Sequence, residues 1–260
     1  MADRRDELAA NSGWSEQVRK IRALTPARVL AGRAGAGYRT ETQIQLREDH
    51  AAARDAVRME FDMRAAFDAG FIEKWKLFEV RTRASTKDEY LLHPSLGREF
   101  CDAARTAILR SCVPGRDFQI AVGDGLSVPA IRAQVPALLP LLVSGAEARG
   151  WSVGRPFAIK YSRVGILNEI GELLKPRVAV LLIGERPGLA TAESLSAYIA
   201  YQPRAKHSDA DRNLISNIHA RGLSAEDAAA RILNLCAQMV KVGGSGYALK
   251  ENRPALERNQ

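Results

Sequence analysis

The chain has 260 residues, of which 46% are hydrophobic, 26% charged and 6% aromatic, and it carries a formal net charge of +8 at pH 7. This length suits one large domain or a major and a minor one, and no uninterrupted apolar stretch approaches the roughly 18 residues that cross a bilayer. A membrane protein is therefore not expected. The positive excess is spread over both halves of the chain without a basic block, which argues against a nucleic-acid-binding protein.

The N-terminus and the cysteines favour a cytoplasmic protein. Residues 1–13 contain no apolar signal core, and the three cysteines form no CxxC pair and no zinc-binding spacing with a histidine. Cys101 and Cys112 are 11 residues apart, so on a helix they would share one face as small core residues. The four histidines are scattered, and none forms a metal-binding motif. No metal site is expected.

Residues 1–92 are predicted to form a small, mainly helical N-terminal domain. Apolar residues at helical spacing predict a helix over residues 15–24, and Thr25, followed by proline, predicts the start of a further short helix. Thr40 with Gln43 has the pattern of a capping box for a long polar helix.

Two other segments of this region predict turns or strands. The glycine-rich residues 31–37 follow no buried strand and lack the Gly-Lys-Ser/Thr of a phosphate loop, so they predict a turn between helices. Residues 77–84 and 89–93, separated by polar residues, predict a small β-hairpin.

Residues 93–260 are predicted to form an α/β domain. Periodic apolar residues predict one amphipathic helix from residue 93 to 113, and a second clear helix spans residues 223–241 with Ser224 as its cap. Apolar strands alternate with helical segments between them, and the predicted strands are residues 118–122, 157–161, 178–183 and 195–201. Such alternation predicts a Rossmann-like, three-layer domain with a mostly parallel sheet and helices on both faces.

The sequence GDGLS at residues 123–127 follows the first of these strands and precedes a helix. Free backbone N–H groups at such a turn favour an anion, and Ser127 is a candidate contact to a phosphate or an amide. Val128 replaces the third glycine of a dinucleotide fingerprint, and no acidic residue for a ribose follows the second strand. An NADP-binding oxidoreductase with Arg163 on the extra phosphate therefore stays as the alternative.

Glu185 and Arg186 follow the strand at residues 178–183, at the edge where open α/β sheets bind ligands. They could be a general base with an electrostatic partner, or an ion pair at a tight turn. No complete set of catalytic residues is present, so no catalytic residue is assigned. We expect a chain that binds a ligand without performing all of the chemistry itself.

Several motifs also occur together in one order. They are GRAG at 32–35, GDGLS at 123–127, KYSRV at 160–164, IGELL at 170–174, VLLIGERPGL at 180–189, ESLSAY at 193–198 and ADRNLISNIH at 210–219. In this combination the chain closely resembles the light (small) chain of ethanolamine ammonia-lyase, over residues 20–245.

The resemblance implies a subunit of an adenosylcobalamin-dependent lyase that deaminates ethanolamine to acetaldehyde and ammonia by a radical mechanism. A heavy chain would hold the substrate, and the light chain, inactive alone, would help to enclose the cobalamin in a hetero-oligomer with further light chains. The implied cofactor contacts are Val164, Glu185 and Leu214, and relatives can carry a cysteine at the place of Leu214. We add Ser127 as an expected cofactor contact, to the phosphate or an amide of the cobalamin. No DxHxxG motif is present, so no histidine of this chain is expected on cobalt.

Some relatives carry a longer N-terminal extension that directs them into a bacterial microcompartment. The short polar lead of this chain favours free cytoplasm, and association with a heavy chain leaves encapsulation open.

Overall fold

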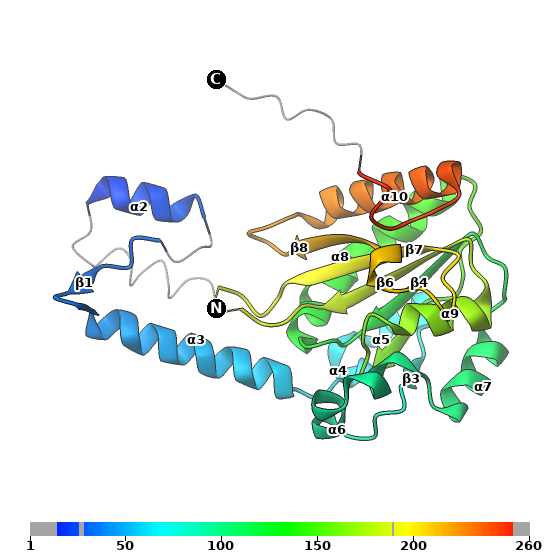
Figure 1. Ribbon diagram of the computed structural model, residues 1–260, viewed down its shortest axis with the longest axis horizontal. Helices are drawn as coiled ribbons and strands as arrows, with labels where there is room; N and C mark the ends of the chain where they lie inside the picture. Colours follow the sequence, from blue (N-terminus) through cyan, green and yellow to red (C-terminus); the bar gives the residue numbers. More distant parts are fainter. Residues whose placement is uncertain (1–14, 26–28, 189, 252–260) are drawn as a thin grey trace.

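The computed structural model describes residues 15–25, 29–188 and 190–251, and Figure 1 shows the arrangement of its elements. In chain order they are α2 (Glu16–Ala23), β1 (Arg33–Ala34), β2 (Gly37–Tyr38), α3 (Thr40–Arg58), α4 (Met63–Ala66), α5 (Ala69–Trp75), β3 (Glu79–Arg81), α6 (Lys87–Leu92), η1 (Pro94–Arg98), α7 (Asp102–Ser111), β4 (Phe118–Gly123), α8 (Val128–Glu147), β5 (Phe157–Lys160), α9 (Ile166–Leu174), β6 (Val178–Gly184), β7 (Leu195–Tyr201), η2 (Asp209–Asp211), β8 (Asn213–Ile218) and α10 (Ala225–Val242). The short helix predicted after Thr25 falls largely outside the described residues.

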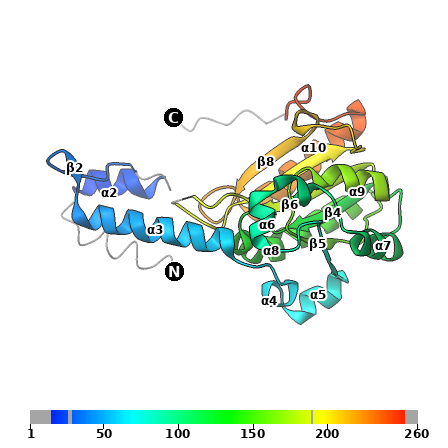
Figure 2. The ribbon, with the colours of Figure 1, turned by 60° about the horizontal axis from the view of Figure 1, so that its bottom comes forward.

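The first elements form an arm that extends away from the α/β body. It consists of α2, the β1–β2 hairpin and the long helix α3 (Figures 1 and 2). The predicted helix at residues 15–24 is confirmed as α2, with Val18 N donating to its cap, Ser15 Oγ, at 3.4 Å. The predicted capping box at Thr40 is wrong. Thr40 is the first residue of α3, and its N-cap, Arg39, makes no capping side-chain hydrogen bond.

The hairpin predicted at residues 77–93 is also wrong. Its first half contributes β3, which pairs in parallel with β5, and its second half is α6, where Thr86 Oγ1 caps the helix by accepting from Glu89 N at 3.1 Å. A non-local strand partner and a helix cap therefore replace the local pairing. The division into domains 1–92 and 93–260 stays a prediction, and β3 belongs to the main sheet although it lies before residue 92.

The main sheet has six strands in the order β3-β5-β4-β6-β7-β8. The pairs from β3 to β6 are parallel, whereas β6–β7 and β7–β8 are antiparallel. The expected mostly parallel sheet is therefore corrected to a mixed one. A parallel neighbour needs a crossover of a dozen or more residues, usually a helix, but the described residues between β6 and β7, 185–188 and 190–194, contain no helix. The finer class, a Rossmann-like three-layer domain, stays a prediction.

Helices cover both faces of the sheet. One core lies between the sheet and the helices α8 and α10, and the second lies under α7 and α9. Strands β4 and β6 are buried along their whole length, which explains their continuous apolar sequences. Helix α10 begins after Ser224, as predicted. By length and composition α8 alone among the described helices could cross a membrane, but core helices meet the same criterion, and its buried residues belong to the first core.

The single helix predicted at residues 93–113 is interrupted. It divides into η1 and α7, because Phe100 leaves the helix to form an isolated bridge with Thr82 and donates its N–H to Glu169 Oε2. Cys101 and Cys112 flank α7. Cys112 is buried in the core under α9, and the half-buried Cys101 packs against it, as expected for small core residues.

Candidate functional site

Two predicted site residues, Glu185 and Leu214, lie on one face of the sheet. Glu185 directly follows β6, and its Oε1 accepts a hydrogen bond from Ser196 Oγ of β7 at 2.7 Å. Leu214 of β8 is the cross-strand partner of Tyr198, two residues after Ser196. Alternate residues of a strand, and residues directly paired across strands, point to the same face. Since Tyr198 packs against the core under α9, all four side chains lie on the α9 side.

Val164 lies on the same side, but Ser127 does not. Val164 is in the connection between β5 and α9 and packs, half-buried, against the same core. Ser127 is fully buried at the start of α8, which covers the opposite face. Its Oγ accepts from Ala130 N at 3.3 Å and donates to the carbonyl of Ala192. To donate a hydrogen bond to a ligand, the Ser127 hydroxyl would have to release the carbonyl of Ala192.

Glu185 is held as an oriented carboxylate. Besides the bond from Ser196, its Oε1 accepts from the backbone N–H of Asn217 at 2.9 Å. Within the described part of the chain Oε2 makes no hydrogen bond, and the side chain is half-buried. Arg186 is exposed, and no ion pair joins it to Glu185 among the described residues. The ion-pair interpretation is therefore wrong, and one oxygen of Glu185 is left to accept from a ligand.

Asn217 has an unusual backbone conformation, and hydrogen bonds hold both its backbone carbonyl and its side chain. Its φ is 63°, in the left-handed region, and its carbonyl accepts from Leu223 N at 2.8 Å. His219 Nε2 lies 2.8 Å from Asn217 Oδ1, and His219 Nδ1 accepts from Arg221 N at 3.2 Å. The neutral ring therefore carries its proton on Nε2 and donates to Asn217. Burial lowers the pKa of His219, although the negative charge of Glu185 acts in the opposite direction.

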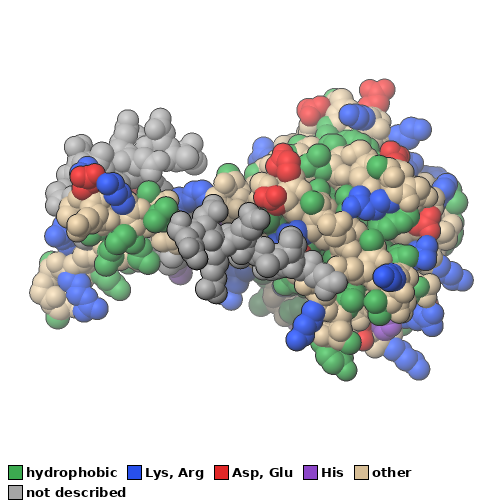
Figure 3. All heavy atoms as spheres, turned by 90° about the horizontal axis from the view of Figure 1, so that it is seen from above, with side chains coloured by type: hydrophobic (Ala, Val, Ile, Leu, Met, Phe, Trp, Pro, Cys, Tyr) green, Lys and Arg blue, Asp and Glu red, His purple; other side chains and the backbone are tan. Residues whose placement is uncertain are grey.

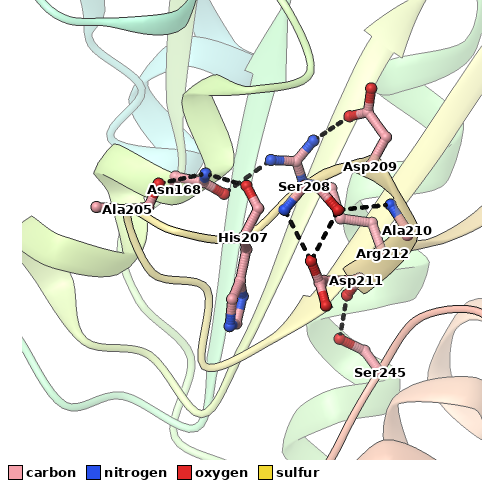
Figure 4. Close-up of polar contacts among 9 residues, drawn as sticks. All are labelled: Asn168, Ala205, His207, Ser208, Asp209, Ala210, Asp211, Arg212 and Ser245. Carbon is pink, nitrogen blue, oxygen red and sulfur yellow. Dashed lines mark hydrogen bonds and ion pairs between the residues drawn. The ribbon is translucent and has the colours of Figure 1, made fainter.

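Arg212 attaches the segment before β8 to helix α9 (Figure 4). The arginine is buried, its Nη2 donates to Asn168 Oδ1 at 2.7 Å, and its Nη1 pairs with Asp209. The Asn168 amide donates in turn to the carbonyl of His207 at 2.7 Å. These contacts fix residues 205–212 beside Tyr198.

The hydroxyl of Tyr198 lies within the electrostatic influence of both this segment and Glu185. Burial raises the pKa of its hydroxyl, and the negative charges of Asp209 and Glu185 add to the effect, whereas Arg212 opposes it. The hydroxyl is therefore protonated at neutral pH and can donate or accept a hydrogen bond. Sequence reasoning assigned no role to Tyr198, Arg212, Asn217 or His219. Its only signal was their presence in the motifs ESLSAY and ADRNLISNIH.

The predicted anion-binding turn is filled by the backbone of the protein itself. Leu126 N donates to the carbonyl of Gly184 at 3.1 Å, and Ser127 N donates to that of Asp124 at 3.3 Å. Gly125 has a φ of +56°, and a Cβ on it would lie 2.3 Å from the Gly184 oxygen. The close approach of this turn to the end of β6, and not a phosphate, explains the glycine.

The NADP alternative receives no support from the neighbouring residues. Arg163 stacks its guanidinium 4.3 Å from the ring centroid of Tyr90 and donates to the Tyr90 carbonyl at 3.2 Å. Tyr90 OH donates to the carbonyl of Ser162, two residues after β5, and Lys87 Nζ lies 3.8 Å from Asp124 Oδ2, directly after β4. Helix α6 thus covers the carboxyl ends of β4 and β5, and Arg163 is engaged by α6.

The part of the chain that the structure describes contains no group of three or more His, Cys, Asp or Glu residues that could hold a metal ion. The polar groups on the α9 side are a carboxylate, a phenol, amides and a guanidinium. This set suits hydrogen bonding to a large polar ligand.

Comparison with known proteins identifies the family. The family model of the ethanolamine ammonia-lyase light chain matches residues 15–250. The ethanolamine ammonia-lyase small subunit of Clostridium acetobutylicum is 39% identical over 235 residues, which cover 90% of this chain and 95% of the relative. The small subunit of Fusobacterium nucleatum is 40% identical over 92% of this chain and 79% of its own length, and that of Clostridium perfringens 42% over 94% and 80%. The chain belongs to the ethanolamine ammonia-lyase light chain family.

Proposed function

We propose that this chain is the light subunit of an ethanolamine ammonia-lyase, a carbon–nitrogen lyase that releases acetaldehyde and ammonia from ethanolamine. The observation that carries this conclusion is the family match over residues 15–250, together with relatives of about 40% identity along nearly the whole chain. The site agrees with a subunit role, because it offers oriented hydrogen-bonding groups without an evident nucleophile and base pair.

We further propose that the α9 side of the sheet edge contacts adenosylcobalamin through Val164, Glu185, Tyr198 and Leu214. Cobalamin carries many side amides around an apolar ring edge, which Glu185 Oε2 can bind as an acceptor and the Tyr198 hydroxyl as a donor or acceptor. Leu214, 47% exposed, offers apolar contact surface. When bound, adenosylcobalamin supplies the radical that takes a hydrogen from the substrate. The residues of this chain bind and orient the cofactor and exclude water from one side of it.

A heavy chain would complete the enzyme. Of the proposed contacts, Tyr198 and Leu214 lie on β7 and β8, and Leu214 is exposed, so a second subunit is needed to hold the substrate and enclose the cofactor. We therefore infer that the light chain is inactive alone.

The N-terminal arm is proposed to make subunit contacts, with the heavy chain or with further light chains of a higher hetero-oligomer. Helix α2 buries none of its residues, and α3 buries only Ala56. Hydrophobic side chains are visible on the surface of the arm (Figure 3). Exposed apolar residues of this kind, such as Ile21, Leu24 and Ile44, are typical of an interface.

For localisation we propose the cytoplasm, with encapsulation in a bacterial microcompartment depending on the heavy chain that it joins. Fractionation of cells expressing both chains would separate the two locations.

Reconstitution tests the proposed function. The chain is co-expressed with the heavy chain encoded in the same genome, and ethanolamine deamination is measured with and without adenosylcobalamin. We expect activity only when both chains and the cofactor are present. Deamination by the heavy chain alone at the same rate, or no activity of a purified two-chain complex, would contradict the proposal.

A further inference from the structure

We propose that His219 is a positioning residue, which acts through Asn217 to fix the carboxylate of Glu185 where it can contact the cofactor. The inference rests on the proposed contact between Glu185 and adenosylcobalamin. His219 itself is 6% exposed and lies behind Asn217, so it can influence a ligand only through other residues.

A continuous series of hydrogen bonds joins the three residues. Arg221 N donates to His219 Nδ1 at 3.2 Å, His219 Nε2 to Asn217 Oδ1 at 2.8 Å, and Asn217 N to Glu185 Oε1 at 2.9 Å. The bond from Arg221 N requires an unprotonated Nδ1, so the proton of His219 is on Nε2 and can be donated to Asn217. This bond from His219 holds the side chain of Asn217, whose backbone N–H binds Glu185.

The bond from His219 matters because Asn217 has a backbone conformation that needs support from its surroundings. A residue with positive φ other than glycine costs on the order of 1–3 kcal/mol unless its surroundings impose the conformation. At its φ of 63° Asn217 directs its N–H toward Glu185, so relaxation to an ordinary strand conformation would withdraw this donor. The bond from His219 opposes that relaxation because it ties the Asn217 side chain.

Tight packing around the turn provides a second, independent constraint. A Cβ on Gly222 would lie 2.3 Å from the Asn217 carbonyl oxygen and 2.8 Å from His219 Nε2. Only glycine allows the chain to approach both groups so closely. The turn after β8 is therefore built around the bond between His219 and Asn217. The charged groups that act on His219 are Glu185, Glu193 and Arg221.

Two substitutions of His219 separate its hydrogen bond from its volume. His219→Phe keeps an aromatic ring but removes the donor, whereas His219→Gln keeps an amide donor. In the complex with the heavy chain, hydrogen exchange of peptides spanning β8 is measured by mass spectrometry, and cobalamin affinity by absorbance titration. We expect His219→Phe to speed exchange at β8 at least about tenfold and to weaken affinity several-fold, with partial recovery in His219→Gln. His93→Phe, an exposed histidine elsewhere, should change neither.

Asn217→Ala gives an independent variant if His219→Phe does not fold. Alanine keeps the backbone N–H and the cost of the positive φ but removes the acceptor for His219, so nothing from His219 then opposes relaxation and the same two changes are expected. In a Glu185→Ala background, His219→Phe should weaken affinity no further. Unchanged exchange in His219→Phe, or a further loss of affinity in that background, would overturn the inference. Faster exchange with unchanged affinity would support the positioning of Glu185 and instead overturn its proposed cofactor contact.

Discussion

Lys87 Nζ lies 3.8 Å from Asp124 Oδ2, and the two side chains are only 7% and 0% exposed. Neither atom makes a hydrogen bond in the described part of the chain, whereas Asp124 Oδ1 accepts from Ser162 N at 2.8 Å. Burial lowers the pKa of Lys87 and raises that of Asp124, and the charge of each residue partly offsets the shift of the other. The pair fastens α6 over the carboxyl ends of β4 and β5.

Removal of the cation should therefore destabilise the protein strongly. Lys87→Met leaves a buried carboxylate without its counter-charge, and we expect the free energy of unfolding to fall by about 3 kcal/mol. The double variant Lys87→Met, Asp124→Asn should lose less than Lys87→Met. Urea unfolding measures both, with the exposed Lys206→Met as a control that should change by less than about 0.5 kcal/mol. A loss below about 1 kcal/mol in Lys87→Met would show that the pair contributes little.

Two glycines with positive φ allow a steric effect to be separated from backbone strain. Gly125 (φ +56°) and Gly115 (φ +77°) differ in their surroundings, since a Cβ would meet the Gly184 oxygen at 2.3 Å in the first and nothing within 4 Å in the second. We expect Gly115→Ala to cost about 1 kcal/mol from strain alone and Gly125→Ala to cost at least about 2 kcal/mol more. Thermal and urea unfolding compare the two. Equal losses would mean that the GDGLS turn can move away from β6.

Protonation of His219 should destabilise the folded state below about pH 6.5. Because its folded pKa is lowered by burial, the unfolded chain binds the proton first as the pH falls. The stability that depends on neutral His219 is therefore complete above the unfolded pKa and is lost between that value and the folded pKa. The difference in unfolding free energy between wild type and His219→Gln should shrink from pH 7.5 to 5.5. A pH-independent difference would contradict this prediction.

Glu185→Ala should weaken cobalamin binding without unfolding the chain. It removes a half-buried acceptor at the edge of the sheet, and we expect the apparent affinity of the assembled enzyme to fall about tenfold, which corresponds to about 1.4 kcal/mol. Arg186→Ala, the exposed neighbour, is the matched control and should leave affinity unchanged. Equal affinities of the two variants would remove Glu185 from the contact surface.

The strands that were easiest to predict from the sequence are those with a continuous apolar run. β4 and β6 are buried on both faces, so an apolar run was a sufficient signal. β8 was not predicted, because its polar Asn213, Ser216 and Asn217 and a bulge in its pairing interrupt the alternation. The antiparallel direction of β7 could not be predicted either, since it depends on the path of the loop after Glu185.

The sequence likewise predicted only part of the candidate site. Glu185 was identified because it follows a recognisable strand. Tyr198 and Arg212 depend on how β8 and the segment before it pack against β7 and α9, and no local pattern encodes that packing. The role of His219 depends on the left-handed backbone of Asn217, which is a property of the folded turn.

The length of α3 has a consequence for assembly. Its 19 residues span roughly 28 Å, so the apolar surface at the far end of the arm stands out from the body, whose sheet edge carries Glu185 (Figure 1). A partner that binds both surfaces would be attached at two separated points, and attachment at the first would raise the effective concentration of the second. Each contact can then be individually weak while the assembly is durable. The edge that we propose to contact the cofactor could open and close again without the subunits separating.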